Sequence, residues 1–294
     1  MVDVSVVIPS YNCGAWLAES LDSMLAQADE TVEVIVIDDG STDDTQRVLA
    51  GYRDRVTVVQ GEHRGLAAAR NLGLSRARGA WIAFHDADDV ALPRRLPFQR
   101  AFLAAHPDVD AIFCNGERMD DPARRMVPAD IVRDVAGRAL TVSHLFAGYP
   151  VYFQGALVAR AAFDRAGPFD ETFRVQPEIE YGYRFFPRCR AMFVDEVVFR
   201  YRWHTTNTSR DLLGTRVDIA RTLEDVLVRD PHLVDEIGGQ RFRARLARHH
   251  FRIACSRLKQ GDAAGAGVEA RRATALYPLH PRYQLLRMRC ALSQ

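Results

Sequence analysis

The chain has 294 residues, 48% of them hydrophobic, and a formal net charge of +1, which suits one large globular domain or a domain with an appendage. Its five cysteines are scattered without a Cys-x-x-Cys pair, which argues against a zinc site and favours a reduced, cytosolic protein. No signal peptide is expected, because Asp3 stands where such a peptide would carry positive charge, and no run of ~20 apolar residues is found. The only lysine, Lys259, excludes an earlier Walker A or Schiff-base lysine.

The first ninety residues alternate between short apolar runs and segments with helical spacing. Strands are predicted at Val4–Pro9, Val32–Ile37, Val56–Gln60 and Trp81–Phe84, with helices at Ala15–Gln27, Asp43–Tyr52 and Gly65–Ala77. Ser41 or Thr42 is expected to cap the second helix. This alternation predicts an α/β fold with a doubly wound, mainly parallel sheet.

The next segments continue this pattern and then change to helices alone. Strands are predicted at Ala111–Asn115, Val151–Val158 and Val194–Tyr201, with helices at Pro93–Ala105, Arg160–Ala166 and Glu178–Phe186 and a loop at Met119–Arg138. From Asp211 onward two to four helices are expected, within Gly214–Val228, Arg241–Gln260, Ala263–Tyr277 and Arg282–Leu292. We therefore predict a domain at residues 1–210 and a helical C-terminal region at residues 211–294.

The charge of the helical end differs from that of the rest of the chain. Residues 241–294 contain 12 basic and 2 acidic residues, so this part carries +10 and the remainder carries −9. The excess indicates either a solvated helical surface or attraction to an anionic membrane face or a phosphorylated acceptor. A nucleic-acid partner is not expected, because no RNA-binding signature accompanies the charge.

Polar side chains follow three of the predicted strands. They are Ser10-Tyr11-Asn12, Asp38-Asp39 and Asp86-Ala87-Asp88-Asp89. The carboxyl ends of parallel strands share one edge of a sheet, where ligands bind. Three neighbouring carboxylates repel one another unless solvent, hydrogen bonds or a cation compensates them, and a hard divalent metal with a diphosphate is one such arrangement.

Four motifs in this order resemble the nucleotide-sugar half of family 2 glycosyltransferases with the GT-A fold. They are Ser5–Asn12, Val36–Asp43, Ala69-Arg70-Asn71-Leu72-Gly73 and Phe84–Asp89. The resemblance covers about the first 210 residues. It implies a GT-A domain and transfer of a sugar from a nucleotide diphosphate donor.

The resemblance also implies roles for single residues in donor binding. Tyr11 would stack on the nucleobase, beside Pro9 and Ser10. Asp39 would accept a hydrogen bond from the base, with Asp38 close by, and Arg70 would lie near the base and diphosphate. Asp86 would contact the ribose, and Asp88 would bind Mg²⁺ or Mn²⁺. Residue chemistry agrees, because an aromatic face holds a flat base and a guanidinium matches phosphate oxygens. Each residue also has a purely structural interpretation, such as a turn, a solvated loop, a surface helix or core packing.

The acceptor side departs from the family pattern. Members usually carry a Glu-Asp pair on a helix after a Gly-x-Phe-Asp-Glu turn, and this turn is present at Gly167–Glu171. Pro177 and Glu178 then occupy the positions of the pair. The resemblance makes Glu178 the candidate general base, with Glu180 as the alternative or with both as surface carboxylates. In the Tyr201–Ser209 segment, His204 is either a ligand of the metal or diphosphate, or a structural histidine.

These features predict a metal-dependent, inverting glycosyltransferase with a UDP-sugar as the expected donor and Mg²⁺ or Mn²⁺ as cofactor. The expected acceptor is a glycan or lipid-linked carrier in bacterial surface polysaccharide or glycoconjugate synthesis. We expect a cytoplasmic protein whose basic helices contact an anionic membrane surface peripherally. Two alternatives stay open: a non-catalytic sugar-nucleotide-binding subunit, motivated by the Pro177-Glu178 departure, and a nucleotidyltransferase.

Overall fold

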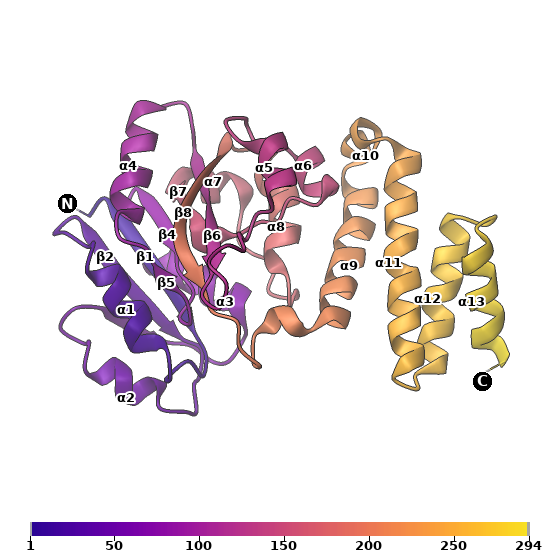
Figure 1. Ribbon diagram of the computed structural model, residues 1–294, viewed down its shortest axis with the longest axis horizontal. Coiled ribbons are helices and arrows are strands. Elements are labelled where there is room, and N and C mark those ends of the chain that lie inside the picture. Colours follow the sequence, from indigo (N-terminus) through magenta and orange to yellow (C-terminus); the bar gives the residue numbers. More distant parts are fainter. Residues whose placement is uncertain (1, 293–294) are drawn as a thin grey trace. The chain divides into compact units, whose positions relative to one another are not determined.

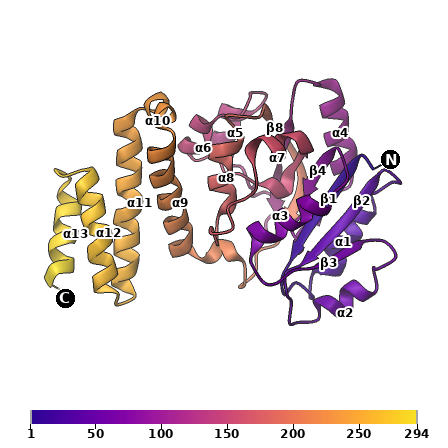
Figure 2. The ribbon, with the colours of Figure 1, turned by 180° about the vertical axis from the view of Figure 1, so that it is seen from behind.

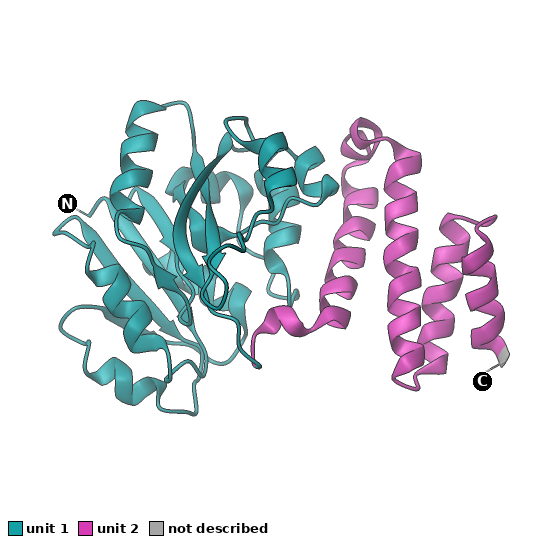
Figure 3. Ribbon diagram, viewed as in Figure 1, with its two compact units in different colours: residues 1–205 teal, residues 206–294 magenta. Residues whose placement is uncertain are grey.

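The computed structural model describes residues 2–292 and divides the chain into two compact units. Unit 1 comprises residues 1–205 and unit 2 comprises residues 206–294 (Figure 3). The boundary lies a few residues before the one that the loss of strand signals predicts. Each unit has its own core, so each is described by itself.

Unit 1 is built on one mixed sheet with the strand order β3-β2-β1-β4-β7-β6-β8-β5. The strands are β1 (Val4–Ser10), β2 (Val32–Asp38), β3 (Thr57–Gln60), β4 (Trp81–Phe84), β5 (Val90–Ala91), β6 (Ala111–Arg118), β7 (Ala156–Ala159) and β8 (Ala191–Tyr201). The four strands from β3 to β4 are parallel, as predicted, because helices connect them. Strand β7 runs antiparallel to both β4 and β6, and β5 runs antiparallel to β8.

Helices cover both faces of this sheet (Figures 1 and 2). Val4, Val6 and Ile8 point to the face covered by α1 (Leu17–Leu25), α2 (Thr45–Ala50) and α4 (Arg95–Ala105). Val7 points to the opposite face, as alternation along a strand requires, and meets α3 (Leu66–Arg76). A side chain at Gly73 of α3 would lie 2.2 Å from Val7 Cγ1, so α3 lies directly on β1.

The face that carries α3 also holds an aromatic cluster. Phe84 of β4 meets Phe153, Phe163 and Phe169 edge to face at 5.7–6.2 Å between ring centroids. The cluster continues into α7 (Arg160–Ala166) and α8 (Pro177–Phe185) through Tyr181. These rings bury much apolar surface and fix α8 against the sheet.

The second half of unit 1 differs from the predicted elements. The predicted loop at Met119–Arg138 contains α5 (Ala129–Val135), and an additional helix, α6 (Val142–Ala147), follows it. The predicted strand at Val151–Val158 is mostly wrong, because Phe153–Gly155 form a 3₁₀ turn and pairing begins only at Ala156. Apolar runs this short do not distinguish a strand from a buried turn.

The predicted caps of the second helix are also wrong. The residue before α2 is Asp44, and Ser41 and Thr42 instead join two loops. The Ser41 hydroxyl accepts a hydrogen bond from the Asn12 backbone N–H at 2.9 Å, and the Thr42 N–H donates to Asn12 Oδ1 at 2.8 Å. Asn12 has a φ of +52°, a left-handed conformation that asparagine tolerates well. The polar side chains therefore lock the loops after β1 and β2 together.

Unit 2 is entirely helical in its described part, beginning with the 3₁₀ turn Thr208–Arg210. Its helices are α9 (Leu212–Arg229), α10 (Pro231–Ile237), α11 (Gly239–Lys259), α12 (Ala263–Leu276) and α13 (Pro281–Leu292), of which α10 was not predicted. Asp211, Asp230 and Asp262 cap α9, α10 and α12 by accepting backbone N–H groups. Within residues 2–292, no helix combines the length and apolar character that crossing a membrane demands.

Candidate functional site

Strand register brings the three predicted polar segments to one edge of the sheet. Ser10 pairs with Asp38, and Asp38 pairs with Gln60, so β1, β2 and β3 end side by side. The backbone N–H of His85 donates to Val7 O at 3.0 Å, which aligns the acidic loop after β4 (Asp86–Asp89) with the end of β1. This carboxyl edge is where open parallel sheets bind their ligands.

A stacked pair of rings stands at one side of this edge. Tyr11, which is 43% exposed, stacks on His63 with 4.1 Å between ring centroids and 28° between planes. His63 has a φ of +56°, so the loop after β3 is tightly turned where it meets Tyr11. Pro9 and Ser10, which precede Tyr11, are buried, and Ser10 Oγ has no hydrogen-bond partner among the described residues. An exposed aromatic face of this kind can hold a flat ring.

Both predicted carboxylates at the end of β2 accept hydrogen bonds from backbone N–H groups. Asp38 is fully buried, and its Oδ1 accepts from the Ser41 N–H at 3.0 Å. Asp39 Oδ1 accepts from the Arg64 N–H at 2.9 Å, and Oδ2 accepts from the Gly65 N–H at 2.7 Å, directly before α3. Asp39 therefore fixes the start of α3 and the loop that carries His63. Each carboxylate oxygen has a second lone pair, which leaves room for a further donor.

The acidic loop after β4 is joined to the segment after β8. Asp88 Oδ2 lies 2.8 Å from His204 Nε2, and the His204 ring stacks on Trp16 at 4.0 Å. Arg202 anchors the same loop, because its Nε donates to Asp88 O and its N–H donates to Asp89 Oδ1, both at 2.9 Å. The predicted site residues Asp88 and His204 are thus in direct contact.

Desolvation makes this loop reluctant to carry its full negative charge. It raises the pKa of Asp86 to about 7; the Arg70 cation opposes the rise, whereas the charges of Asp88 and Glu178 add to it. Burial, with the neighbouring Asp88 and Asp86 charges, also raises the pKa of Asp89 well above its usual range. Asp89 Oδ2 is buried without a hydrogen-bond partner in the described part of the chain. Additional positive charge at this loop would relieve the repulsion.

The side chain of Arg70, which the resemblance puts near the base and diphosphate, is fully buried. Nη1 donates to Glu178 Oε1 at 2.6 Å, and Nη2 lies 3.7 Å from Asp86 Oδ1. One guanidinium thus lies between the acidic loop and α8, because packing of Phe169 and α8 over α3 encloses it.

The two candidate bases on α8 point to different partners. Glu178 contacts Arg70 at the acidic loop, whereas Glu180 forms a two-point ion pair with Arg184 at 2.7 and 2.8 Å. Arg184 also donates to Ala166 O at 2.8 Å, which ties Glu180 to the end of α7. Residues two apart on a helix point to nearly opposite sides, so only one of them can face the site.

The residues present fit a hard divalent cation at Asp88 and His204. Within residues 2–292, no three His, Cys, Asp or Glu side chains are grouped so that they alone could hold a metal ion. Metal–oxygen distances of ~2.1 Å place neighbouring ligands ~3 Å apart, close to the observed 2.8 Å between the two side chains. Mg²⁺ and similar ions commonly take one or two protein ligands and complete their shell with substrate phosphates and water.

Two residues of this edge were not singled out from the sequence. Trp16 lies within the first predicted helix, Ala15–Gln27, and its ring stacks on that of His204. His63 lies between Gly61 and Gly65, and this glycine spacing is the one signal that could have marked a tightly turned loop. In both stacked pairs, Tyr11 with His63 and Trp16 with His204, the two residues are far apart in the sequence.

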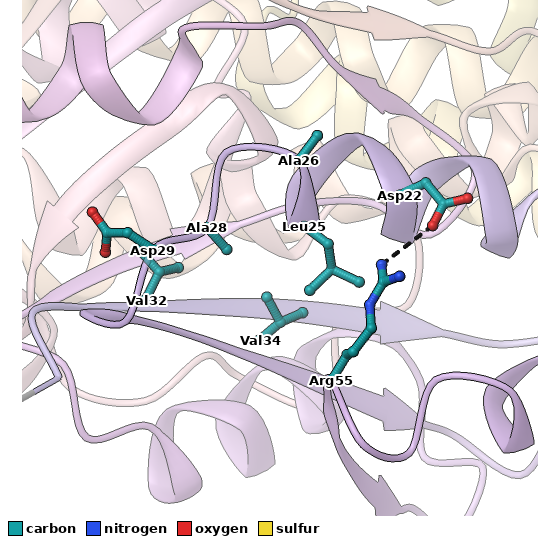
Figure 4. A pocket seen from close by; sticks show the side chains of 8 residues that line it. All are labelled: Asp22, Leu25, Ala26, Ala28, Asp29, Val32, Val34 and Arg55. Carbon is teal, nitrogen blue, oxygen red and sulfur yellow. Dashed lines mark hydrogen bonds and ion pairs between the residues drawn. The ribbon is translucent and has the colours of Figure 1, made fainter.

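A separate pocket of about 540 Å³ lies between the end of α1 and the start of β2 (Figure 4). Leu25, Val32 and Val34 form its apolar floor, and Arg55 reaches Asp22 across its rim at 3.4 Å. Val32 is the first residue of its strand, so the pocket lies at the amino end of the sheet. It is therefore distinct from the site at the carboxyl edge.

Comparison with known proteins decides the family. The family profile described as Glycosyl transferase family 2 matches residues 5–156, which is more than half of the chain. The chain belongs to glycosyltransferase family 2. An uncharacterized glycosyltransferase of Rickettsia prowazekii is 28% identical over 222 residues, covering 74% of this chain and 70% of that protein. The protein is accordingly a glycosyltransferase.

Solved structures establish the GT-A fold of this glycosyltransferase. TarS of S. aureus, in complex with UDP-GlcNAc, superimposes with a TM-score of 0.72 at 20% identity, covering 99% of this chain and 89% of that chain. The mannosyltransferase PcManGT of Pyrobaculum calidifontis, in complex with GDP-Man and Mn²⁺, gives a TM-score of 0.62 at 22% identity, covering 99% and 80%. The predicted family and fold class are thus confirmed.

Proposed function

We propose that this glycosyltransferase moves a sugar from a UDP-sugar to an acceptor hydroxyl with inversion of the anomeric centre. The observation that carries the proposal is the placement of Glu178 at the acidic loop, where Arg70 lies between Glu178 and Asp86. Tyr11, with Pro9 and Ser10, would bind the nucleobase. The hydrogen bonds of the base would be accepted by Asp38 and Asp39, and the ribose would contact Asp86. A carboxylate only accepts hydrogen bonds, which suits the N–H of uracil.

The chemistry proposed for this site uses Glu178 as the general base. Its carboxylate removes the proton of the acceptor hydroxyl, and the acceptor oxygen forms a bond to the anomeric carbon from the side opposite the diphosphate. The bond between that carbon and the diphosphate oxygen breaks, which releases a nucleoside diphosphate. Asp88 and His204 would hold Mg²⁺ or Mn²⁺, which when bound offsets the negative charge that grows on the leaving group.

A donor panel tests this proposal directly. Thermal unfolding is measured with UDP-, GDP- and dTDP-sugars, each with and without Mn²⁺. A UDP-sugar with Mn²⁺ is expected to raise the melting temperature most, by ~5 °C at a hundredfold excess over its dissociation constant.

The products then decide between functions. Transfer releases the nucleoside diphosphate, whereas release of pyrophosphate would identify a nucleotidyltransferase. Donor binding without turnover on any glycan or lipid-linked acceptor would favour a non-catalytic binding subunit.

The acceptor is proposed to be a glycan or lipid-linked carrier of bacterial surface polysaccharide or glycoconjugate synthesis, which unit 2 would meet at a membrane surface. After Glu269 the chain has five arginines and no acidic residue. On α13, Tyr283, Leu286 and Cys290 are buried, while Leu285 and Met288 are 65% and 58% exposed. An apolar stripe beside arginines is typical of helices that lie on anionic lipid.

Vesicle binding tests this surface. The protein is expected to sediment with phosphatidylglycerol vesicles but not with phosphatidylcholine vesicles, and 0.5 M salt should weaken binding. Leu285→Gln with Met288→Gln should lower binding ~10-fold, because two apolar side chains no longer enter the interface. Val228→Gln on α9, where an exposed apolar residue is likewise lost, is the matched control. Equal binding to both lipids, or self-association through α13 instead of lipid binding, would contradict the proposal.

A further inference from the structure

We infer that Arg70 is a positioning residue for the general base rather than a ligand of the diphosphate. In this arrangement the Arg70 guanidinium holds the Glu178 carboxylate in place and ties it to the acidic loop. The inference rests on the proposed function, because it takes Glu178 as the base. It adds that α3, and not α8 alone, sets the position of that base.

The burial of Arg70 supports this role. Its side chain has no exposed surface, whereas a residue that binds a diphosphate must present its guanidinium to the donor. Among the described residues, its guanidinium makes one hydrogen bond, to Glu178 Oε1 at 2.6 Å, which is short and charge-assisted. Nε and Nη2 have no hydrogen-bond partner within residues 2–292. The directional contact of this cation is therefore made with the candidate base.

The planar group of Arg70 packs beside two rings that also contact each other. Its Cζ lies 5.2 Å from the centre of the Phe84 ring and 5.6 Å from that of Phe169. Both distances allow cation–π attraction, which is stronger away from water. Because Phe84 belongs to β4 and Phe169 to the turn before α8, the guanidinium has little freedom to turn away from Glu178.

The next residue on α3 fixes the same turn. Asn71 Oδ1 accepts from the Phe169 N–H at 2.8 Å, and Asn71 Nδ2 donates to Phe169 O at 2.9 Å. Arg70 and Asn71 thus attach both the base and the turn that precedes its helix to α3. The two neighbouring residues connect the donor half of the sheet with the acceptor half.

Charge balance gives Arg70 a second effect on the base. Asp86 and Glu178 are two carboxylates on either side of one guanidinium, and they would repel each other without it. Removing the cation would leave a poorly solvated negative pair, and the Glu178 side chain would be expected to turn toward water. A displacement of about 1 Å is enough to cost ~100-fold in rate.

Replacement of Arg70 separates the two roles. For Arg70→Met we expect kcat to fall ~100-fold while the dissociation constant of UDP with Mn²⁺ stays within ~3-fold of wild type. Arg70→Lys should lose less, because it keeps the charge but not the planar contact. Guanidinium ion added to Arg70→Ala should restore part of kcat. If UDP binding weakens as much as kcat falls, Arg70 binds the diphosphate and the inference is wrong.

A double mutant and a matched control complete the test. Arg70→Met should add little to the loss of kcat in Glu178→Gln, since residues that act through one another are not additive. Arg184→Met breaks the comparable ion pair to Glu180 on the same helix and should leave kcat of the folded protein unchanged. If Arg70→Met does not fold, kcat and the dissociation constant of UDP are compared in Arg70→Lys instead. Wild-type turnover in Glu178→Gln would overturn the proposed base itself. If turnover falls in Glu178→Gln but not in Arg70→Met, only the inference about Arg70 is wrong.

Discussion

Glu178→Gln is expected to lower glycosyl transfer by 10²–10⁴-fold, the range that general-base catalysis contributes. The amide keeps the size of the side chain and can still accept the Arg70 hydrogen bond, but it cannot take up the acceptor proton. Donor binding should persist, because the predicted nucleotide contacts come from β1, β2 and the acidic loop. The measurement is single-turnover transfer, with UDP affinity determined on the same preparation by calorimetry.

Glu180→Gln is the matched control, since it removes a carboxylate two residues away on the same helix. Its ion pair with Arg184 is buried on the Glu180 side, so the change should cost about 2 kcal/mol of unfolding free energy. The folded fraction should transfer sugar at the wild-type rate. If Glu180→Gln were inactive and Glu178→Gln active, the base would be assigned to the wrong face of α8.

Asp88→Asn is expected to remove the metal requirement of donor binding together with most of the binding. The amide contributes no charge to the cation, and removal of even a group that supports metal ligands costs 10–100-fold, so we expect a loss of at least ~100-fold in Mn²⁺-dependent UDP affinity. Calorimetry with UDP in the presence and absence of Mn²⁺ measures it. Mn²⁺ paramagnetic resonance on the same samples reports the ion itself.

The control for this change is Asp44→Asn, an exposed carboxylate in the same unit that pairs with Arg47. Surface ion pairs contribute little, so donor affinity and stability should both stay near wild type. His204→Gln should lie between the two, because Asp88 would retain the cation. Should Asp88→Asn bind UDP as tightly as wild type, with the same response to Mn²⁺, the acidic loop is not the metal site.

Sequence patterns predicted the first half of unit 1 well and the second half less well. Strand β4 has the predicted bounds, and the helices up to α4 lie within or close to theirs, because each follows from local apolar periodicity. Strand β5 was missed, since two residues carry no periodicity and pairing with Phe199 and Arg200 defines the strand. Helices α5, α6 and α10 are short and were missed, although Thr141 with His144 forms a capping box at α6 and Asp230 followed by Pro231 begins α10.

What the sequence alone determined was the set of chemical groups at the carboxyl edge. Ser10 and Asp38 end their strands and Asp86 lies two residues after β4, and parallel strands bring their ends together whatever the rest of the chain does. The order of four motifs likewise determined the family. Both depend on residues close together in the chain or on a general property of parallel sheets.

Tertiary structure alone decided the partners of these groups. Arg70 and Glu178 are 108 residues apart, and their contact depends on how α8 packs over α3 through the aromatic cluster. Whether Glu178 or Glu180 faces the acidic loop depends on the rotation of α8, which the burial of Tyr181 and Phe185 sets. Trp16 and His204 also come from distant segments of the chain, and only tertiary packing brings their rings together. Local patterns specify elements and their chemistry, but the free energy of burying side chains from distant segments selects which of them touch.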